Sequence, residues 1–491
     1  MGKETDNVTR INSEDDFSDF EDLLPQHDDF EEEHVDDSDK VPMPIDPKGI
    51  DLSRPPGFVG HVANWIDGQC RYPRRKLAVA SAIVAVGNIG GLTHRDARDD
   101  ATANMIAFCV AASSSGKEAV MQAFTDLHIE AGMQGAVHGS IKSEQEIMRN
   151  VIDMQASFYN IDELGIFMTK VKNAQKRGGS AAYLEGIFGA IMSIFSKASA
   201  RYLLGGDGKR ELLKMYSGAL SKAQDNGDAG REAAAQRKLD MVTTGLVRPF
   251  MSIMGYTTPS TFIDIMDGAT ATQGLLGRAI VVNEKDINPR PRYGFKKTEM
   301  PFNMRLVIRR LAGDASGHDS GAVEHYGDRK DIETTPEASA LLDKVLDWFL
   351  DYADEMNEAT GEAGVAMIRR SFESVAKISY TLAIPGGTRT EEHVAWAFAY
   401  VKAEVDGKIQ MVFANDNARS APEQALAARV LSILDTEKGM SVSVLSNRLK
   451  VGPETISPVL DEMAARGMVR SMKSKRKSKG QYIQQWVQIA H

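Results

Sequence analysis

The sequence predicts an α/β protein built on a parallel sheet. Short apolar runs at 105–110, 157–161, 250–254 and 278–282 are typical of buried strands, and helical stretches separate them. Strands without an alternating polar face, joined by helices, indicate a parallel sheet covered on both sides. The length of 491 residues suggests two or three folded units besides tails.

Most of the negative charge lies at the N-terminus. Residues 1–45 contain 16 Asp and Glu and 3 Lys and Arg, whereas the rest of the chain is nearly neutral. A segment so acidic cannot bury enough apolar surface to offset its ordering entropy, so residues 1–50 are expected to form a disordered acidic tail. Within it, residues 16–24 mix acids with apolar side chains, a pattern that serves either partner binding or simple solubility.

Four regions are expected after the tail. Residues 51–100 are predicted to be helical, 101–300 to hold the sheet, and 301–415 to be helical again. In residues 420–491, three helical patterns precede two short strands, which is the order of a winged helix.

The composition argues against a membrane protein and a zinc ribbon. No apolar run is long enough to cross a bilayer, and the acidic N-terminus is no signal peptide, so a cytoplasmic protein without a membrane partner is expected. Cys70 and Cys109 are the only cysteines, too few for the paired spacings of a zinc ribbon. We expect both thiols to be packed in a reduced protein, with a disulfide between them as the alternative that counting leaves open.

A phosphate-binding loop is predicted after the first strand. The segment from Ala111 to Glu118 joins that strand to a helix through small residues and one lysine. Backbone N–H groups of such a turn can cradle phosphates, and Lys117 would reach the outer phosphate oxygens. Ala111 replaces the usual glycine and Glu118 the usual Ser or Thr, so an ordinary strand-to-helix turn is the alternative. The predicted nucleotide-binding residues are Ser113, Ser114, Ser115, Gly116, Lys117 and Glu118.

An acidic pair follows the second strand. Asp162 at such a strand end can hold Mg2+, with Glu118 as a second candidate ligand, and Glu163 can polarise the attacking water as a general base. A helix N-cap followed by first-turn acids is the alternative interpretation. Asp162 lies 45 residues after Lys117, which leaves room for a helix and one more strand and favours a shared site.

Two further polar signals stand at strand ends. Thr258 follows the third strand and is a candidate for sensing the γ-phosphate, although a turn before Pro259 would look the same. Arg278 follows a glycine-rich segment and suits an arginine finger, which stabilises transition-state charge across a subunit boundary. A surface or core-paired arginine is the alternative.

Taken in order, these motifs resemble the primase–helicase-type AAA+ ATPases of phages, plasmids and genomic islands. The resemblance covers roughly residues 55–405 and includes the Pro-Pro-Gly-Phe opening at 55–58, the Gly-Lys loop, the Asp-Glu pair, Met-Gly-Tyr-Thr-Thr-Pro at 254–259 and Gly-Leu-Leu-Gly-Arg at 274–278. The segment 368–373 is similar to the lid of minichromosome-maintenance helicases. Their sensor arginine corresponds to Arg370 here, with Arg369 as the alternative.

The resemblance implies a P-loop NTPase fold of the AAA+ kind that uses ATP and Mg2+. It implies hydrolysis between the subunits of a ring, expected to be a hexamer, and translocation on single-stranded DNA. The expected protein is a replicative helicase of a phage or mobile element in a bacterial cytoplasm, with residues 301–415 as the lid and a replication protein as partner of the tail. Relatives that also prime carry an additional primase domain, which we do not expect here.

Two basic regions are candidates for contacting DNA. Residues 197–248 contain ten Lys and Arg and six Asp and Glu, in an insert before the third strand, although a solvated helical face would look alike. Residues 466–480 contain seven Lys and Arg and no acid, at the expected hairpin tip; docking of a protein is the alternative there. The predicted DNA-binding residues are Lys209, Arg210, Lys214, Lys473, Lys475, Arg476, Lys477 and Lys479.

A second function stays open on the loop sequence itself. Glu118 adds negative charge beside a triphosphate, and Ala111 removes a glycine from the loop. Both changes fit a nucleotide-binding helicase loader or origin-binding scaffold that assembles without fast turnover.

Overall fold

The computed structural model describes residues 42–112, 116–169, 182–265, 274–286, 289–313, 329–420, 422–434, 438–465, 468–475 and 482–489. Contacts group residues 43–491 into one compact unit. Among the described residues, no helix is long and apolar enough to cross a membrane. Cys70 and Cys109 are free and buried, as expected, and burial raises the pKa of Cys70 to about 12.

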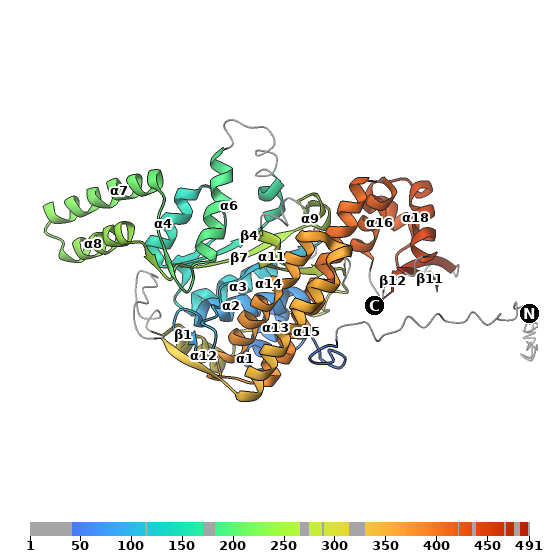
Figure 1. The fold of residues 1–491 in the computed structure, drawn as a ribbon, viewed down its shortest axis with the longest axis horizontal. Helices are drawn as coiled ribbons and strands as arrows, with labels where there is room; N and C mark the ends of the chain where they lie inside the picture. Colours follow the sequence, from blue (N-terminus) through green and yellow to red (C-terminus); the bar gives the residue numbers. More distant parts are fainter. Residues whose placement is uncertain are drawn as a thin grey trace, which may run out of the picture. The chain divides into compact units, whose positions relative to one another are not determined.

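A five-stranded parallel sheet forms the centre of this unit, which confirms the mixed α/β fold (Figure 1). Its strand order is β3-β4-β7-β2-β8, and every neighbouring pair is parallel. Nearly all side chains of the four longer strands are buried, as their uninterrupted apolar sequences require. The strands are β2 (Ile106–Ala111), β3 (Val137–His138), β4 (Ala156–Ile161), β7 (Phe250–Thr257) and β8 (Ala279–Glu284).

The strand order brings three strand ends to one edge of the sheet. Val110 of β2 pairs with Thr257 of β7, and Ile161 of β4 pairs with Gly255 of β7. The connection that leaves β2 passes β7 and β4 to reach β3, whereas the connection that leaves β7 passes β2 to reach β8. The connections of the neighbouring strands β2 and β7 therefore run in opposite directions along the sheet. Parallel sheets bind ligands at such a switch point, outside the carboxyl ends of the strands.

Helices cover both faces of the sheet. Figure 1 shows α2 and α3 on one side and α4 and α6 on the other. The helix α2 is apolar on all sides and almost wholly buried, since it packs against α1, α3 and three strands. The helices up to β7 are α1 (Gly57–Gly68), α2 (Arg75–Gly90), α3 (Lys117–Glu130), α4 (Glu144–Met154), α6 (Ala182–Phe195), α7 (Gly206–Asp225) and α8 (Ala229–Thr244), with a 3-10 turn η3 at Gln134–Ala136.

The insert before β7 is a pair of helices. The antiparallel strands β5 (Arg201–Tyr202) and β6 (Leu246–Val247) form its base, and α7 and α8 pack against each other. The side chain of Asp228 accepts a hydrogen bond from Arg231 N and so caps α8 at the turn between the helices. In Figure 1 this pair extends away from the central sheet.

Side chains of one helix cover the exposed edge of β8. In α15 (Glu391–Ser420), Glu404 accepts a hydrogen bond from Val281 N at 2.7 Å, and Lys408 donates to Ala279 O at 3.0 Å. The two side chains are buried and lie 3.1 Å apart. They occupy the backbone groups that a further strand would use, which closes the sheet edge.

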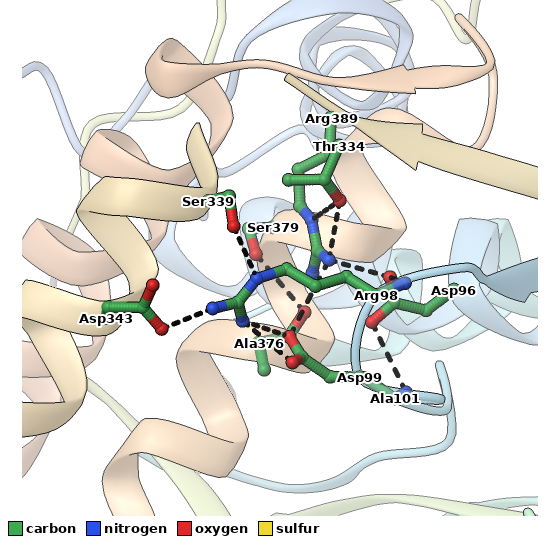
Figure 2. Close-up of polar contacts among 10 residues, drawn as sticks. All are labelled: Asp96, Arg98, Asp99, Ala101, Thr334, Ser339, Asp343, Ala376, Ser379 and Arg389. Carbon is green, nitrogen blue, oxygen red and sulfur yellow. Dashed lines mark hydrogen bonds and ion pairs between the residues drawn. The ribbon is translucent and has the colours of Figure 1, made fainter. Parts of the chain in front are cut away.

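A smaller parallel sheet, of order β1-β9-β10, joins segments that are distant in sequence. Arg389 Nη2 lies 2.6 Å from Asp96 Oδ1, and both side chains are fully buried (Figure 2). Arg389 also donates to Thr334 Oγ1. This ion pair therefore connects all three strands, which are β1 (His94–Asp96), β9 (Lys330–Thr334) and β10 (Thr388–Arg389).

The remaining helices form the region after the sheet and a C-terminal unit. The C-terminal unit has its own apolar core, which includes Val430, Leu445, Leu460 and Trp486. It shows the expected order of three helices followed by an antiparallel hairpin; its assignment as a winged helix stays a prediction. The elements are α9 (Pro259–Ile265), α11 (Leu275–Arg278), α12 (Phe302–Ala312), α13 (Pro336–Glu355), α14 (Asn357–Ala383), α16 (Pro422–Ile433), α17 (Val442–Leu449), α18 (Pro453–Ala465), β11 (Val469–Lys475) and β12 (Tyr482–Gln488).

Candidate nucleotide-binding site

The loop after β2 ends in a glycine that starts α3. Gly116 is the N-cap of α3 with φ +84°, a conformation that favours glycine. It has no side chain to cap the helix, so the first N–H groups of α3 remain suited to an anion. A Cβ at this position would lie 3.4 Å from Cβ of Tyr72, so that tyrosine packs beside the loop. The predicted residues Ser113, Ser114 and Ser115 lie outside the described residues.

Lys117 and Asp162 form an ion pair across the sheet edge. Nζ of Lys117 lies 2.7 Å from Oδ1 of Asp162, with the lysine side chain 13% and the aspartate side chain 46% exposed. The strands that precede them, β2 and β4, are separated by β7. The fold therefore brings together the cation and the acid that the sequence assigns to phosphate and to magnesium.

The backbone at Glu163 is in an uncommon conformation. Its φ is +54°, in the left-handed region, which costs about 1–3 kcal/mol for a residue with a side chain. The amide of Glu163 donates to Asp162 Oδ1 at 2.9 Å, and its carbonyl accepts from Ile166 N in the helix that follows. Such strain is concentrated at functional sites, and here it leaves the carboxylate of Glu163 exposed beside Asp162.

Two threonines end β7 at the same edge. Thr257 is buried, and a Cβ at Gly165 would lie only 2.1 Å from its Oγ1, so the helix after Glu163 packs directly on it. The predicted sensor Thr258 has its Oγ1 2.9 Å from Thr261 Oγ1 and 3.4 Å from Thr261 N. Its hydroxyl therefore lies over the N-terminus of α9.

Magnesium fits this edge by the chemistry of its oxygen donors. Glu118 is exposed in the first turn of α3, where the helix dipole favours an acid, and Asp162 is the ion-pair partner of the adjacent Lys117. Within the described chain, no cluster of three or more His, Cys, Asp or Glu could form an all-protein metal cage. Magnesium ordinarily binds through one or two carboxylates together with substrate phosphates, which these residues can provide.

Arg278 and Arg370 meet at the opposite edge of the sheet. Arg278 ends α11 just before β8, whose first residue pairs with the first residue of β2. A Cβ at Gly274 would lie 2.7 Å from Nη1 of Arg278 and 2.8 Å from Nη1 of Arg370. Burial, and then the neighbouring Arg370, lower the pKa of Arg278. In the described part of the chain, neither guanidinium has a carboxylate oxygen within 4.0 Å.

The alternative sensor arginine points elsewhere. Arg369 is exposed and its Nη2 lies 2.8 Å from Oδ1 of Asp354 on α13. Of the two neighbours, Arg370 is thus the one that meets the predicted finger.

The predicted DNA-binding residues fall into described and undescribed groups. On α7, Nζ of Lys209 donates to Thr243 O at 3.0 Å, Arg210 has interactions of its own, and Lys214 is exposed. On β11, the side chains of Lys473 and Lys475 lie outside the described part, as do Arg476, Lys477 and Lys479.

The sequence analysis missed Tyr72 and Lys377. Tyr72 borders the predicted phosphate loop at Gly116, and Lys377 is buried on α14 close to Arg278. An aromatic residue in a loop and a lysine in an amphipathic helix give no distinctive pattern, so no sequence signal marks either of them.

The chain matches no protein-family model and no curated protein. Among solved structures, it is similar to the Orc1 protein of Aeropyrum pernix, described in complex with DNA. The identity is 12% over 85% of this chain and 88% of that chain, with a TM-score of 0.16. A score so low carries no argument about this chain.

Proposed function

We propose that this chain is an ATP-dependent motor of the AAA+ kind that acts on DNA, as a ring-forming replicative helicase or translocase of a phage or mobile element. Lys117 binds the outer phosphates, Asp162 holds Mg2+ with Glu118 as a further ligand, and Glu163 orients and deprotonates the attacking water. Bound Mg2+ would neutralise charge on the phosphate oxygens. Thr258 contributes a hydroxyl at the same edge.

The observation that carries this proposal is the separation between the phosphate loop and the arginine pair. Lys117 follows the last residue of β2, whereas Arg278 lies level with its first. Six residues of strand separate these levels, which is about 20 Å at the usual rise per residue. An arginine cannot reach across that length to the phosphates of its own subunit. The pair is therefore suited to the nucleotide of a neighbouring copy, as a ring requires.

Single-stranded DNA is the proposed substrate along which the motor translocates. The helix pair α7–α8 presents Lys214 to solvent, and exposed lysines bind a phosphate backbone by releasing counterions. The basic hairpin of the C-terminal unit is the second proposed contact. The acidic tail is proposed to dock a replication protein, and the cytoplasm of a bacterial host is the proposed location.

The test is ATP hydrolysis by the purified chain with and without single-stranded DNA, beside a Glu163→Gln variant. We expect DNA to stimulate hydrolysis, and the variant to bind ATP but to lose turnover because its water is no longer deprotonated. Turnover that persists in the variant would remove Glu163 from the mechanism.

The alternative is a helicase loader or origin-binding scaffold, and one observation favours it. Lys117 is neutralised by Asp162, and Glu118 adds a further negative charge at the loop. A scaffold would bind nucleotide and assemble, yet show no DNA-stimulated hydrolysis in the same assay.

A further inference from the structure

One face of α14 carries a member of the arginine pair together with two further charged residues. Arg370, Glu373 and Lys377 are spaced by three and four residues, so they lie on one side of the helix. Arg370 meets Arg278 at Gly274, while Lys377 and Arg278 line the same small cavity. Two guanidinium groups and one ammonium thus lie on the side of α14 that carries Glu373.

Lys377 joins α14 to the segment just before β2. Its Nζ donates to Asn104 Oδ1 at 2.8 Å and to Asn104 O at 3.1 Å, and lies 4.3 Å from the centre of the Phe195 ring. Asn104 in turn donates to Phe195 O at the end of α6. The lysine side chain is only 9% exposed, so these contacts are made in a largely dehydrated setting.

The carboxylate of Glu373 interacts with more than one positive charge. Its Oε1 lies 3.5 Å from Nζ of Lys377, and its side chain is 52% exposed. Its negative charge also acts on Arg278, whose pKa it raises against the larger effects of burial and Arg370. Among the described residues, Lys377 is the ion-pair partner of Glu373, so without its ammonium the carboxylate would be free to move towards Arg278, on which its charge already acts.

We propose that Lys377 is a positioning residue for the arginine pair: its ammonium, anchored on Asn104, keeps Glu373 away from Arg278 and Arg370. Both guanidinium groups then stay free of carboxylates and can bind the triphosphate oxygens of a second copy of this chain. This inference rests on the proposed function, because only a bound triphosphate of a neighbouring copy gives the arginine pair an anion to bind.

The variant Lys377→Met removes the charge and the N–H donors of the ammonium while keeping an unbranched side chain that is one atom shorter. We expect DNA-stimulated turnover to fall by about 10²-fold, the effect of a small misplacement at a catalytic site, without a change in ATP affinity. The affinity is preserved because Lys117 and Asp162 lie at the opposite edge of the sheet. Lys344→Met, an exposed lysine of α13, is the matched control and should retain turnover.

The double variant Lys377→Met/Glu373→Gln separates positioning from packing. Removing the carboxylate should restore most of the lost turnover, since nothing then neutralises the arginines. If Lys377→Met loses turnover and the double variant does not regain it, or if Lys377→Met behaves like wild type, the proposal is overturned. Thermal unfolding of each variant shows whether a loss of turnover comes from misfolding. If Lys377→Met misfolds, Lys377→Arg is the second test, and it should retain turnover because it keeps the positive charge.

The pH profile is a readout that packing alone would not change. Burial, the largest cause, lowers the pKa of Lys377 to about 8; Glu373 opposes this shift and Arg278 adds to it. Turnover of the wild type should fall as the pH rises through about 8, whereas Lys377→Arg should stay active because arginine remains charged. A profile that is unchanged in Lys377→Arg would contradict the proposal.

ATP-dependent self-assembly, followed by light scattering, keeps the two proposals distinguishable. If the wild type assembles with ATP but does not hydrolyse it, the motor fails, and a loss of assembly in Lys377→Met with recovery in the double variant still supports this inference. If the wild type hydrolyses ATP and Lys377→Met does so equally well, this inference alone fails. If the wild type neither binds ATP nor assembles, both fail.

Discussion

Nζ of Lys117 lies 2.7 Å from Oδ1 of Asp162, so the cation proposed to bind phosphate and the acid proposed to bind magnesium neutralise each other across the edge of the central sheet. A nucleotide must compete with Asp162 for Lys117, and Mg2+ must compete with Lys117 for Asp162. Binding of the Mg2+–nucleotide complex relieves both contacts together, so this pair would favour the complex over either component.

Asp162→Asn tests this competition. The substitution frees Lys117, so we expect nucleotide measured in EDTA to bind at least as tightly as to wild type. With Mg2+ present, wild type should gain affinity and turnover, whereas the variant should gain neither. Fluorescent-nucleotide titrations with and without Mg2+ measure both effects. A variant that still responds to Mg2+ would show that Asp162 is no ligand, and Lys117→Ala should weaken binding under both conditions.

Gly274→Ala tests the arginine pair. The added Cβ would lie within 2.8 Å of both Nη1 atoms and would also be strained at φ +78°, so the guanidinium groups must shift away from position 274. We expect turnover to be lost while ATP affinity is retained. Gly294→Ala is the matched control, because it has a similar φ of +67° with no atom within 4 Å of the new Cβ. Equal turnover in the two variants would contradict a role for the pair.

Much of the central sheet could be predicted because its strands are buried on both faces. The expected strands at 105–110 and 157–161 match β2 and β4 within one residue, and an uninterrupted apolar run leaves little choice of structure. The proximity of Lys117 and Asp162 follows in the same way from polar residues at parallel strand ends.

The small sheet could not be predicted, because a buried ion pair replaces the apolar pattern. The strands β1 and β10 contain polar residues such as Asp96 and Arg389, which no hydrophobic periodicity reveals. The meeting of Arg278 with Arg370 was equally hidden, since it depends on how α14 packs against α11. The break at Gly361, where φ is +62° inside α14, also has no apolar signal.

The ion pair between Asp96 and Arg389 should contribute strongly to stability. Asp96→Asn removes the fully buried counter-charge of Arg389 and leaves the guanidinium with the more distant, partly exposed Asp99 at 3.8 Å, so we expect a loss of about 3 kcal/mol in the free energy of unfolding. Asp331→Asn, which removes an exposed pair with Arg95, should cost about 1 kcal/mol or less. Urea unfolding measures the free energy of unfolding of both variants. Similar losses would mean that the buried pair with Asp96 contributes no more to stability than the exposed pair with Asp331.

Lys214→Glu tests the proposed DNA contact on α7. If Lys214 binds one phosphate, its loss should reduce the slope of log affinity against log salt by about 0.7 for single-stranded DNA. Fluorescence anisotropy at several salt concentrations gives this slope, with Lys344→Glu on α13 as the control of equal charge change. Identical slopes for the two variants would place the DNA elsewhere.

His128 should make the fold sensitive to mild acid. It is fully buried, its Nδ1 donates to Phe124 O and its Nε2 accepts from Asn88, so the ring is neutral. Burial lowers the pKa of His128 to about 4, while an unfolded histidine titrates near 6.5. Between these values the unfolded state binds the extra proton, so stability is fully present above pH 6.5 and falls as the pH drops towards 4. His128→Gln should flatten the fall in urea-unfolding free energy between pH 6.5 and 5, whereas the exposed His61→Gln should not. If all three proteins lose stability in parallel, the acid sensitivity comes from other groups.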